Sequence, residues 1–147
     1  MSSIGLSVVA EARRWLGTPY LHQASKCGVG ADCLGLLRGV WREVIGAEPF
    51  SIPAYSQDWS EPQGREDLWA AARAVLVERD MGTGADGDVL LFRMRDGAVA
   101  KHLGIATSET NRPGFIHAYS GHGVAESALC APWQRRIVAR FSFPERM

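Results

Sequence analysis

Apolar residues in the first half of the chain recur at the spacing of helices. From Ile4 to Leu16 they return about every 3.6 positions, which predicts a helix that Gly17-Thr18-Pro19 ends. The same spacing from Asp32 to Ile45 predicts a second helix, closed by Gly46. A third is expected over Arg65 to Arg79. The first half is therefore predicted to be helical.

The second half changes to the alternation typical of strands. Strands are expected over Asp88 to Arg93, His102 to Thr107, Gly114 to Tyr119, Val124 to Ser127 and Ile137 to Phe143. Their short connections favour antiparallel pairing. The segments Leu21 to Ala31 and Pro49 to Gly64 lack a period and are expected to be irregular. Helices followed by strands predict an α+β fold, with N-terminal helices packed on a C-terminal antiparallel sheet.

Length and charge limit the number of domains and the kinds of partner to expect. The 147 residues suit a single domain spanning 1–147. A formal net charge of zero gives no reason to expect nucleic acid or an anionic membrane as a partner. We see no apolar run of about 20 residues and no secretory signal pattern. Three cysteines at irregular spacing do not suggest a disulfide framework, so free thiols are expected.

Cys33 is the best candidate for a nucleophile. Asp32 is a good N-cap residue, which places Cys33 in the first turn of the predicted helix. A helix N-terminus, aided by a nearby imidazolium, lowers the pKa of a thiol and favours the reactive thiolate. Cys27 falls in a loop and Cys130 precedes Pro132, so neither has this support. The alternative is a small buried apolar residue, the usual state of an isolated cysteine.

His102 and His117 are candidates for the other catalytic groups. In an extended strand, His102, Gly104 and Ala106 share the face opposite Leu103. The small neighbours of His102 leave room for the beginning of the Cys33 helix. If the strands pair, His117 joins His102 on that face and completes a set of nucleophile, base and orienting residue. The alternative is that each histidine is a surface or satisfied core residue.

Other polar residues give weaker signals. His22 and His122 fall in predicted loops and are expected to be solvated. The cysteines and histidines lack the C-x-x-C or H-x-x-x-H spacing of structural zinc sites. We therefore expect neither a metal nor a cofactor.

Several short motifs, in their order along the chain, resemble those of the NlpC/P60 cysteine peptidases. They are Gly17-Thr18-Pro19-Tyr20, Asp32-Cys33-x-Gly35-Leu36, Gly87-Asp88-Val89-Leu90-Leu91-Phe92, His102-Leu103-Gly104-Ile105 and Phe115-Ile116-His117-Ala118. The resemblance implies a compact papain-like fold. More narrowly, the chain is similar to short cell-wall peptidases of phage tail modules and gene transfer agents. That subgroup is suggested by His22-Gln23-Ala24-Ser25, Phe92-Arg93-Met94-Arg95 and His117-Ala118-Tyr119-Ser120-Gly121.

The resemblance implies a function and roles for particular residues. The expected activity is cleavage of peptidoglycan stem peptides, usually between γ-D-glutamate and a diamino acid. Cys33 matches the nucleophile, His102 the general base and His117 the orienting residue. Tyr20 matches a tyrosine that helps the oxyanion site, and Asp32 the acidic residue beside the nucleophile. Leu34 stands where the family often has a serine linked to recognition of a free substrate amine.

A particle-borne enzyme is the expected setting. The sequence shows no wall-anchoring repeat, SH3-like module or export signal, so we expect synthesis in the cytoplasm and carriage on a phage-like tail or baseplate. A hub or baseplate protein would be the partner, docked on the extra length from Trp59 to Met81. Two alternatives stay open. One is a related thiol amidase or acyltransferase on the same fold, and the other is a structural baseplate subunit with a vestigial site.

Overall fold

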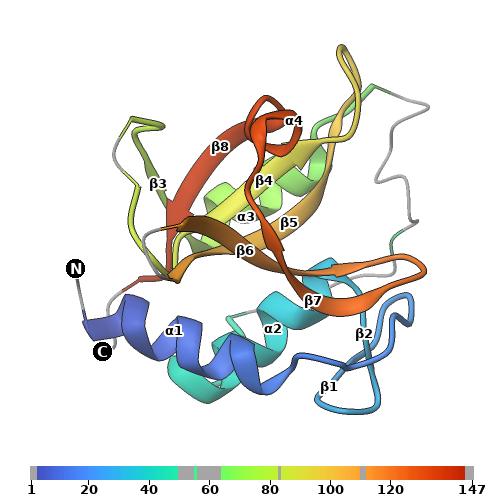
Figure 1. Ribbon diagram of the computed structural model, residues 1–147, viewed down its shortest axis with the longest axis vertical. Coiled ribbons are helices and arrows are strands. Elements are labelled where there is room, and N and C mark those ends of the chain that lie inside the picture. Colours follow the sequence, from blue (N-terminus) through green and yellow to red (C-terminus); the bar gives the residue numbers. More distant parts are fainter. Residues whose placement is uncertain (1–2, 50–54, 56–63, 83, 110–111, 145–147) are drawn as a thin grey trace.

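A computed structural model describes residues 3–49, 55, 64–82, 84–109 and 112–144. Helices α1 (Ser3–Arg14) and α2 (Cys33–Val44) lie together against one face of a twisted sheet (Figure 1). Helix α3 (Asp67–Val75) contributes Leu68 and Ala72 to the same hydrophobic cluster. The short helix α4 (Ala131–Gln134) lies on the other side of the sheet.

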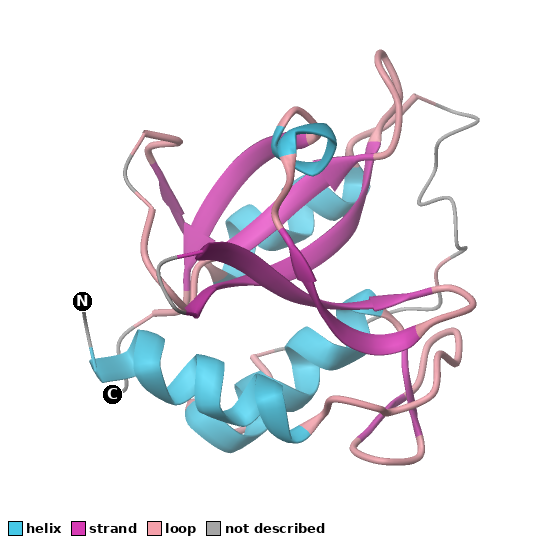
Figure 2. Ribbon diagram, viewed as in Figure 1, coloured by secondary structure: helices cyan, strands magenta, loops and turns pink. Residues whose placement is uncertain are grey.

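The sheet has six strands in the order β3-β8-β4-β5-β6-β7, and every neighbouring pair is antiparallel (Figure 2). The strands are β3 (Val77–Arg79), β4 (Val89–Arg93), β5 (Ala100–Glu109), β6 (Arg112–Tyr119), β7 (Gly123–Ala128) and β8 (Ile137–Ser142). The α+β architecture expected from the sequence is thereby confirmed. No helix among the described residues has the length and apolarity needed to cross a membrane.

Three local predictions need correction. The third helix ends at Val75, because Leu76 is extended and the next residues form β3 on the edge of the sheet beside β8. The predicted loop before α2 contains a small hairpin of β1 (Ser25–Lys26) and β2 (Gly30–Ala31). Helix α4 was not predicted, since four residues are too few to show a period. Most of Pro49 to Gly64 lies outside the described residues.

Two hydrophobic clusters occupy the two faces of the sheet. The larger one joins the helices to residues such as Leu103, Ile105 and Ile116. The smaller one contains Leu90, Phe92, Ala106, Phe115 and Leu129, with Trp133 of α4 packed against it. Because side chains alternate along a strand, Leu103 and Ile105 of β5 lie in the larger cluster, whereas Ala106 lies in the smaller one. This assignment decides where the candidate catalytic residues lie.

Candidate active site

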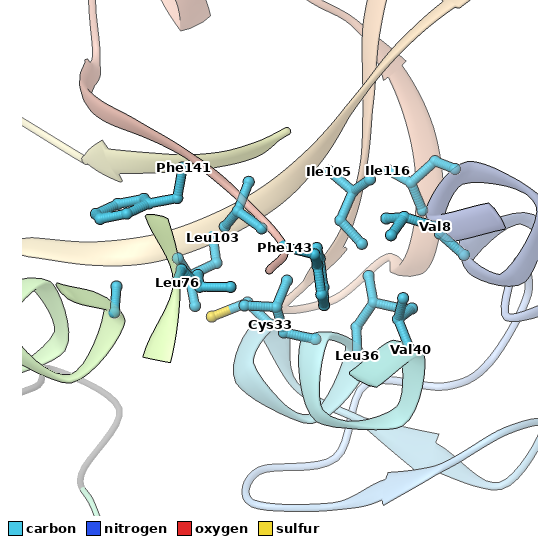
Figure 3. Close-up of a cluster of buried hydrophobic side chains, with 14 of the residues drawn as sticks. Val8, Cys33, Leu36, Val40, Leu76, Leu103, Ile105, Ile116, Phe141 and Phe143 are labelled. Atoms are coloured by element: carbon cyan, nitrogen blue, oxygen red, sulfur yellow. The ribbon is translucent and has the colours of Figure 1, made fainter. Parts of the chain in front are cut away.

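Cys33 is the first residue of α2, and Asp32 caps the helix as predicted. The Asp32 backbone is extended, and its Oδ1 accepts the Gly35 N–H at 2.7 Å. Gly35 has no side chain because the Ala24 carbonyl oxygen occupies the space that a Cβ would need. The thiol lies in the helix-side cluster near Leu76 and Leu103 (Figure 3).

The Cys33 thiol is held in its protonated form. It is 8% exposed, and its Sγ lies 4.0 Å from the Lys101 carbonyl oxygen. Burial, together with the neighbouring Asp32 carboxylate, raises the pKa of Cys33 to about 12. Backbone hydrogen bonds from Leu103, Leu34 and Cys33 itself favour the thiolate but do not offset these effects. The expected lowering of the thiol pKa by the helix N-terminus is therefore present but outweighed, and the net pKa of Cys33 is raised in this conformation.

His102 and His117 meet directly, as the strand alternation predicted. His102 Nε2 lies 2.7 Å from His117 Nδ1, and His117 Nε2 lies 3.0 Å from Ser127 Oγ. Both rings are buried. Burial lowers the pKa of His102 to about 3, aided by the charge of His117. Burial also lowers the pKa of His117 to about 4, aided by His122. The two imidazoles are neutral at physiological pH.

The histidine pair and Cys33 lie on opposite faces of the sheet. His102 is the cross-strand partner of Phe92, and its ring contacts those of Phe92 and Trp133 in the smaller cluster. Leu103, the next residue, points to the helix-side cluster that contains Cys33. The expected placement of His102 opposite the beginning of α2 is therefore corrected.

The space beside His102 is filled by an aromatic ring. At Gly104, a Cβ would come within 2.8 Å of Phe115 Cδ2 and 3.5 Å of the His117 Cβ. The small residue thus accommodates the neighbouring strand rather than α2. The structure brings together His102 and His117, and separately Cys33, Asp32 and Tyr20.

Tyr20 lies beside the thiol and the carboxylate. It pairs with Ala31 through an isolated parallel bridge and packs against the helix-side cluster. Burial raises the pKa of Tyr20 to about 12, with further contributions from the charges of Cys33 and Asp32. A phenol held protonated in this way can donate a hydrogen bond, which is what an oxyanion site requires.

Further polar groups converge on Asp32 that the sequence did not identify. The Tyr55 hydroxyl donates to Asp32 Oδ2 at 2.6 Å, and the Gln23 backbone N–H donates to the same oxygen at 2.7 Å. His22 Nδ1 lies 3.6 Å from Asp32 Oδ2, so the expectation that His22 is simply solvated was wrong. These contacts could not be predicted from the sequence, because the residues around His22 have no regular spacing and Tyr55 is distant along the chain. His122 is exposed, as expected.

Metal binding has no visible basis in this region. Among the described residues, no group of three or more histidine, cysteine, aspartate or glutamate side chains could hold a metal ion. The chemistry available near Cys33 is that of the thiol itself, the carboxylate, two phenols and one imidazole.

Comparisons with known proteins identify the architecture. No protein-family model and no curated protein matches the chain. A solved structure of a lipoprotein-like NLP/P60 family protein from Staphylococcus aureus matches 99% of this chain, with a TM-score of 0.62 and 21% identity. An NlpC/P60 family protein from Bacillus cereus matches 95%, with a TM-score of 0.65 and 17% identity.

Both solved structures are much longer than the region they share with this chain. The match covers 43% of the Staphylococcus aureus protein and 40% of the Bacillus cereus protein. At these identities the likeness concerns the arrangement of helices and strands. Taken with the six-stranded antiparallel sheet and the capped helix that begins at Cys33, it shows that this chain has the NlpC/P60 fold.

Proposed function

We propose that this protein is a cysteine peptidase that cleaves peptides of the bacterial cell wall. The observation that carries the proposal is the position of Cys33. It begins a helix capped by Asp32 and packed on an antiparallel sheet, in a fold shared with NlpC/P60 proteins over nearly the whole chain. A thiol at a helix N-terminus is a suitable nucleophile once it is deprotonated.

Catalysis by this set of residues requires His102 to reach the thiol. The β5 backbone already passes beside Cys33, because the Lys101 carbonyl lies 4.0 Å from its Sγ. The β4–β5 pairing shifts register between Phe92 and Arg93, next to His102. A one-residue change in strand register turns a side chain to the other face, and bulges beside active sites re-aim side chains in this way. The active form that we propose has His102 turned toward Cys33.

In that form the roles follow from ordinary thiol chemistry. His102 accepts the thiol proton, and the Cys33 thiolate attacks the peptide carbonyl carbon. The Tyr20 hydroxyl and the Cys33 N–H stabilise the resulting oxyanion. The proton on His102 passes to the leaving amine as the peptide bond breaks, and water then hydrolyses the thioester. The hydrogen bond between the rings of His102 and His117 belongs to the described conformation, so the orienting role that we propose for His117 requires its ring to move together with His102.

We further propose peptidoglycan stem peptides as the substrate, cleaved between γ-D-glutamate and a diamino acid. The proposed setting is a phage-like tail, with a hub or baseplate protein as the partner. Part of the proposed docking segment, Trp59 to Met81, lies outside the described residues. Within its described part, Leu68 and Ala72 of α3 are buried in the core, so a partner would contact the remaining surface.

Digestion of purified peptidoglycan, with mass spectrometry of the released fragments, tests the activity. We expect new amino termini on the diamino acid with the natural chain and none with Cys33→Ala. Release of intact stem peptides from the glycan would instead indicate an amidase, and transfer products an acyltransferase. No product from either chain, under conditions in which a known wall peptidase is active, would contradict the proposal.

A structural role without catalysis is the second candidate. The separation of Cys33 from the histidine pair and the raised pKa of the thiol favour it. The two candidates predict different results for particles assembled with Cys33→Ala. A peptidase would lose wall penetration while assembly continued, whereas a structural subunit would retain both.

A further inference from the structure

Ser127 lies at the end of a chain of hydrogen bonds that runs through the two buried histidines. Its Oγ lies 3.0 Å from His117 Nε2, and His117 Nδ1 lies 2.7 Å from His102 Nε2. The three residues belong to β7, β6 and β5, which are neighbouring strands of the sheet. Regular secondary structure thus holds a hydroxyl, a base and an orienting group in line, on the face of the sheet opposite Cys33.

One arrangement of protons gives this chain the order of a hydrolytic triad. The Ser127 hydroxyl donates to His117 Nε2, and the His117 Nδ1–H donates to His102 Nε2, which leaves the proton of His102 on Nδ1. Both rings must be neutral for this arrangement. Burial keeps them so by lowering the pKa of His102 to about 3 and the pKa of His117 to about 4. His117 is therefore a base of about the strength of a catalytic carboxylate.

The backbone beside Ser127 supplies a donor for an oxyanion. The Leu129 N–H donates to the Pro113 carbonyl at 3.0 Å, and Ser127 is the cross-strand partner of Phe115. Because residues of an antiparallel strand turn their N–H groups alternately toward and away from the neighbouring strand, the Ala128 N–H points away from β6. That direction is the edge of the sheet, since β7 is its terminal strand. The N–H of the residue after a serine nucleophile forms part of the oxyanion site in other hydrolases.

The surroundings of Ser127 suit an uncharged substrate with an apolar acyl group. Ser127 is half-buried and Ala128 beside it is exposed, so the hydroxyl lies at the border between the core and solvent. The half-buried ring of Trp133 lies 5.0 Å from the ring of Phe115 and 5.4 Å from that of His117, measured between centroids. Aromatic surface next to a nucleophile favours apolar groups over charged ones.

We propose that Ser127, His117 and His102 form a second catalytic site, a serine hydrolase centre for small uncharged esters. Ser127 Oγ attacks the ester carbonyl carbon while its proton passes to His117 Nε2. The bond between that carbon and the alcohol oxygen then breaks, and the leaving alkoxide takes the proton. Water adds to the acyl-serine with the help of the same base, which releases the carboxylic acid and restores the hydroxyl. This activity goes beyond the proposed function and uses the histidines where the described conformation places them.

A fluorophosphonate, which phosphonylates activated serines, tests the site in the Cys33→Ala chain. That chain lacks the thiol of the proposed peptidase, so the result does not depend on whether peptidoglycan is cleaved. Ser108 is the matched control, because it is an exposed strand serine whose hydroxyl donates to the Asp86 carboxylate at 2.9 Å instead of to an imidazole. We expect peptide mapping to find Ser127 labelled about 10²-fold faster than Ser108, and both labelled equally slowly after unfolding in urea.

His117→Gln should slow the labelling of Ser127 by about 10²-fold, because it removes the base. His122→Gln makes the same chemical change on the exposed β6–β7 turn and should leave the labelling nearly unchanged. Circular dichroism checks that both variants are folded. If His117→Gln is not, the comparison of Ser127 with Ser108 in the folded Cys33→Ala chain decides by itself.

Turnover of p-nitrophenyl butyrate in the same Cys33→Ala background shows whether the acyl-serine is hydrolysed. It should fall by about 10²-fold in Ser127→Ala and stay unchanged in Ser108→Ala. Equal labelling of Ser127 and Ser108 in the folded chain, or unchanged turnover in Ser127→Ala, would overturn the proposal. A chain that passes these tests but releases no peptidoglycan fragment with Cys33 restored would contradict only the proposed function.

Discussion

Acidification should destabilise this protein well above the pH at which carboxylates titrate. His102 and His117 are buried as neutral rings, with pKa values lowered from 6.5 to about 3 and about 4. In the unfolded chain both rings bind protons below about pH 6.5. The unfolded state therefore binds more protons than the folded state, so stability is complete above that pH and is lost as the pH falls.

The size of the effect follows from the same values. Between about pH 6.5 and about pH 5, the two rings together contribute a loss of about 3 kcal/mol. The result depends little on the folded pKa values, provided that both lie well below the lower pH. Glu48 and Glu126 have pKa values below the ordinary 4.5. The stability that these two carboxylates contribute to the fold is therefore lost mainly below about pH 5. A loss of stability between about pH 6.5 and about pH 5 therefore reports mainly on the two buried histidines.

Urea unfolding at the two pH values, followed by circular dichroism, measures the loss. The matched chain carries His102→Gln and His117→Gln, which remove both imidazoles and should flatten the dependence whatever they do to absolute stability. Equal stability of the natural chain at both pH values would mean that the rings are solvated. That result would refute their burial beside Phe92 and Phe115 and would favour a resting form with His102 already turned elsewhere.

The remaining predictions concern packing and thiol reactivity. Gly35→Ala should lower the free energy of unfolding by about 1–3 kcal/mol, because its Cβ would overlap the Ala24 carbonyl oxygen. Gly82→Ala is its control, with the nearest atom 3.6 Å from the added Cβ, and should change stability by less than about 0.5 kcal/mol in the same urea measurement. In the free protein at neutral pH, exposed Cys27 and Cys130 should be alkylated before Cys33. Peptide mapping that finds Cys33 labelled first would contradict the raised thiol pKa.

Sequence periodicity was sufficient for the order of most elements. The helix beginning at Cys33 was predicted correctly because Asp32, the apolar spacing and Gly46 all indicate the same boundaries. The strands carrying His102 and His117 were also predicted, since their alternation is regular. The structure after Val75 was not predicted, because in the sequence the three exposed residues of β3 continue the helical pattern. Only their pairing with β8 shows that they form an edge strand.

The site was harder to predict because it depends on which face of the sheet meets the helices. Alternation correctly grouped His102 with His117, but it could not say whether their face or that of Leu103 lies against α2. Packing decides this point. Leu103 and Ile105 fill the space under the helices, while the ring of Phe115 occupies the gap beside Gly104. The contacts of Asp32 with His22 and Tyr55 could not be predicted for another reason. They depend on the path of loops whose sequences have no regular hydrophobic spacing.

Asp32 links the stability of the fold to the state of the thiol. As the N-cap of α2 its side chain must accept hydrogen bonds, and its neighbours Gly35, Gln23 and Tyr55 donate them. Burial, together with the same carboxylate, keeps Cys33 protonated. The carboxylate that caps the helix is therefore also the group that opposes ionisation of the thiol. An imidazole brought to the thiol from β5 would relieve this opposition without loss of the cap. In the proposed peptidase, the described conformation would therefore become active only when a second group reaches Cys33.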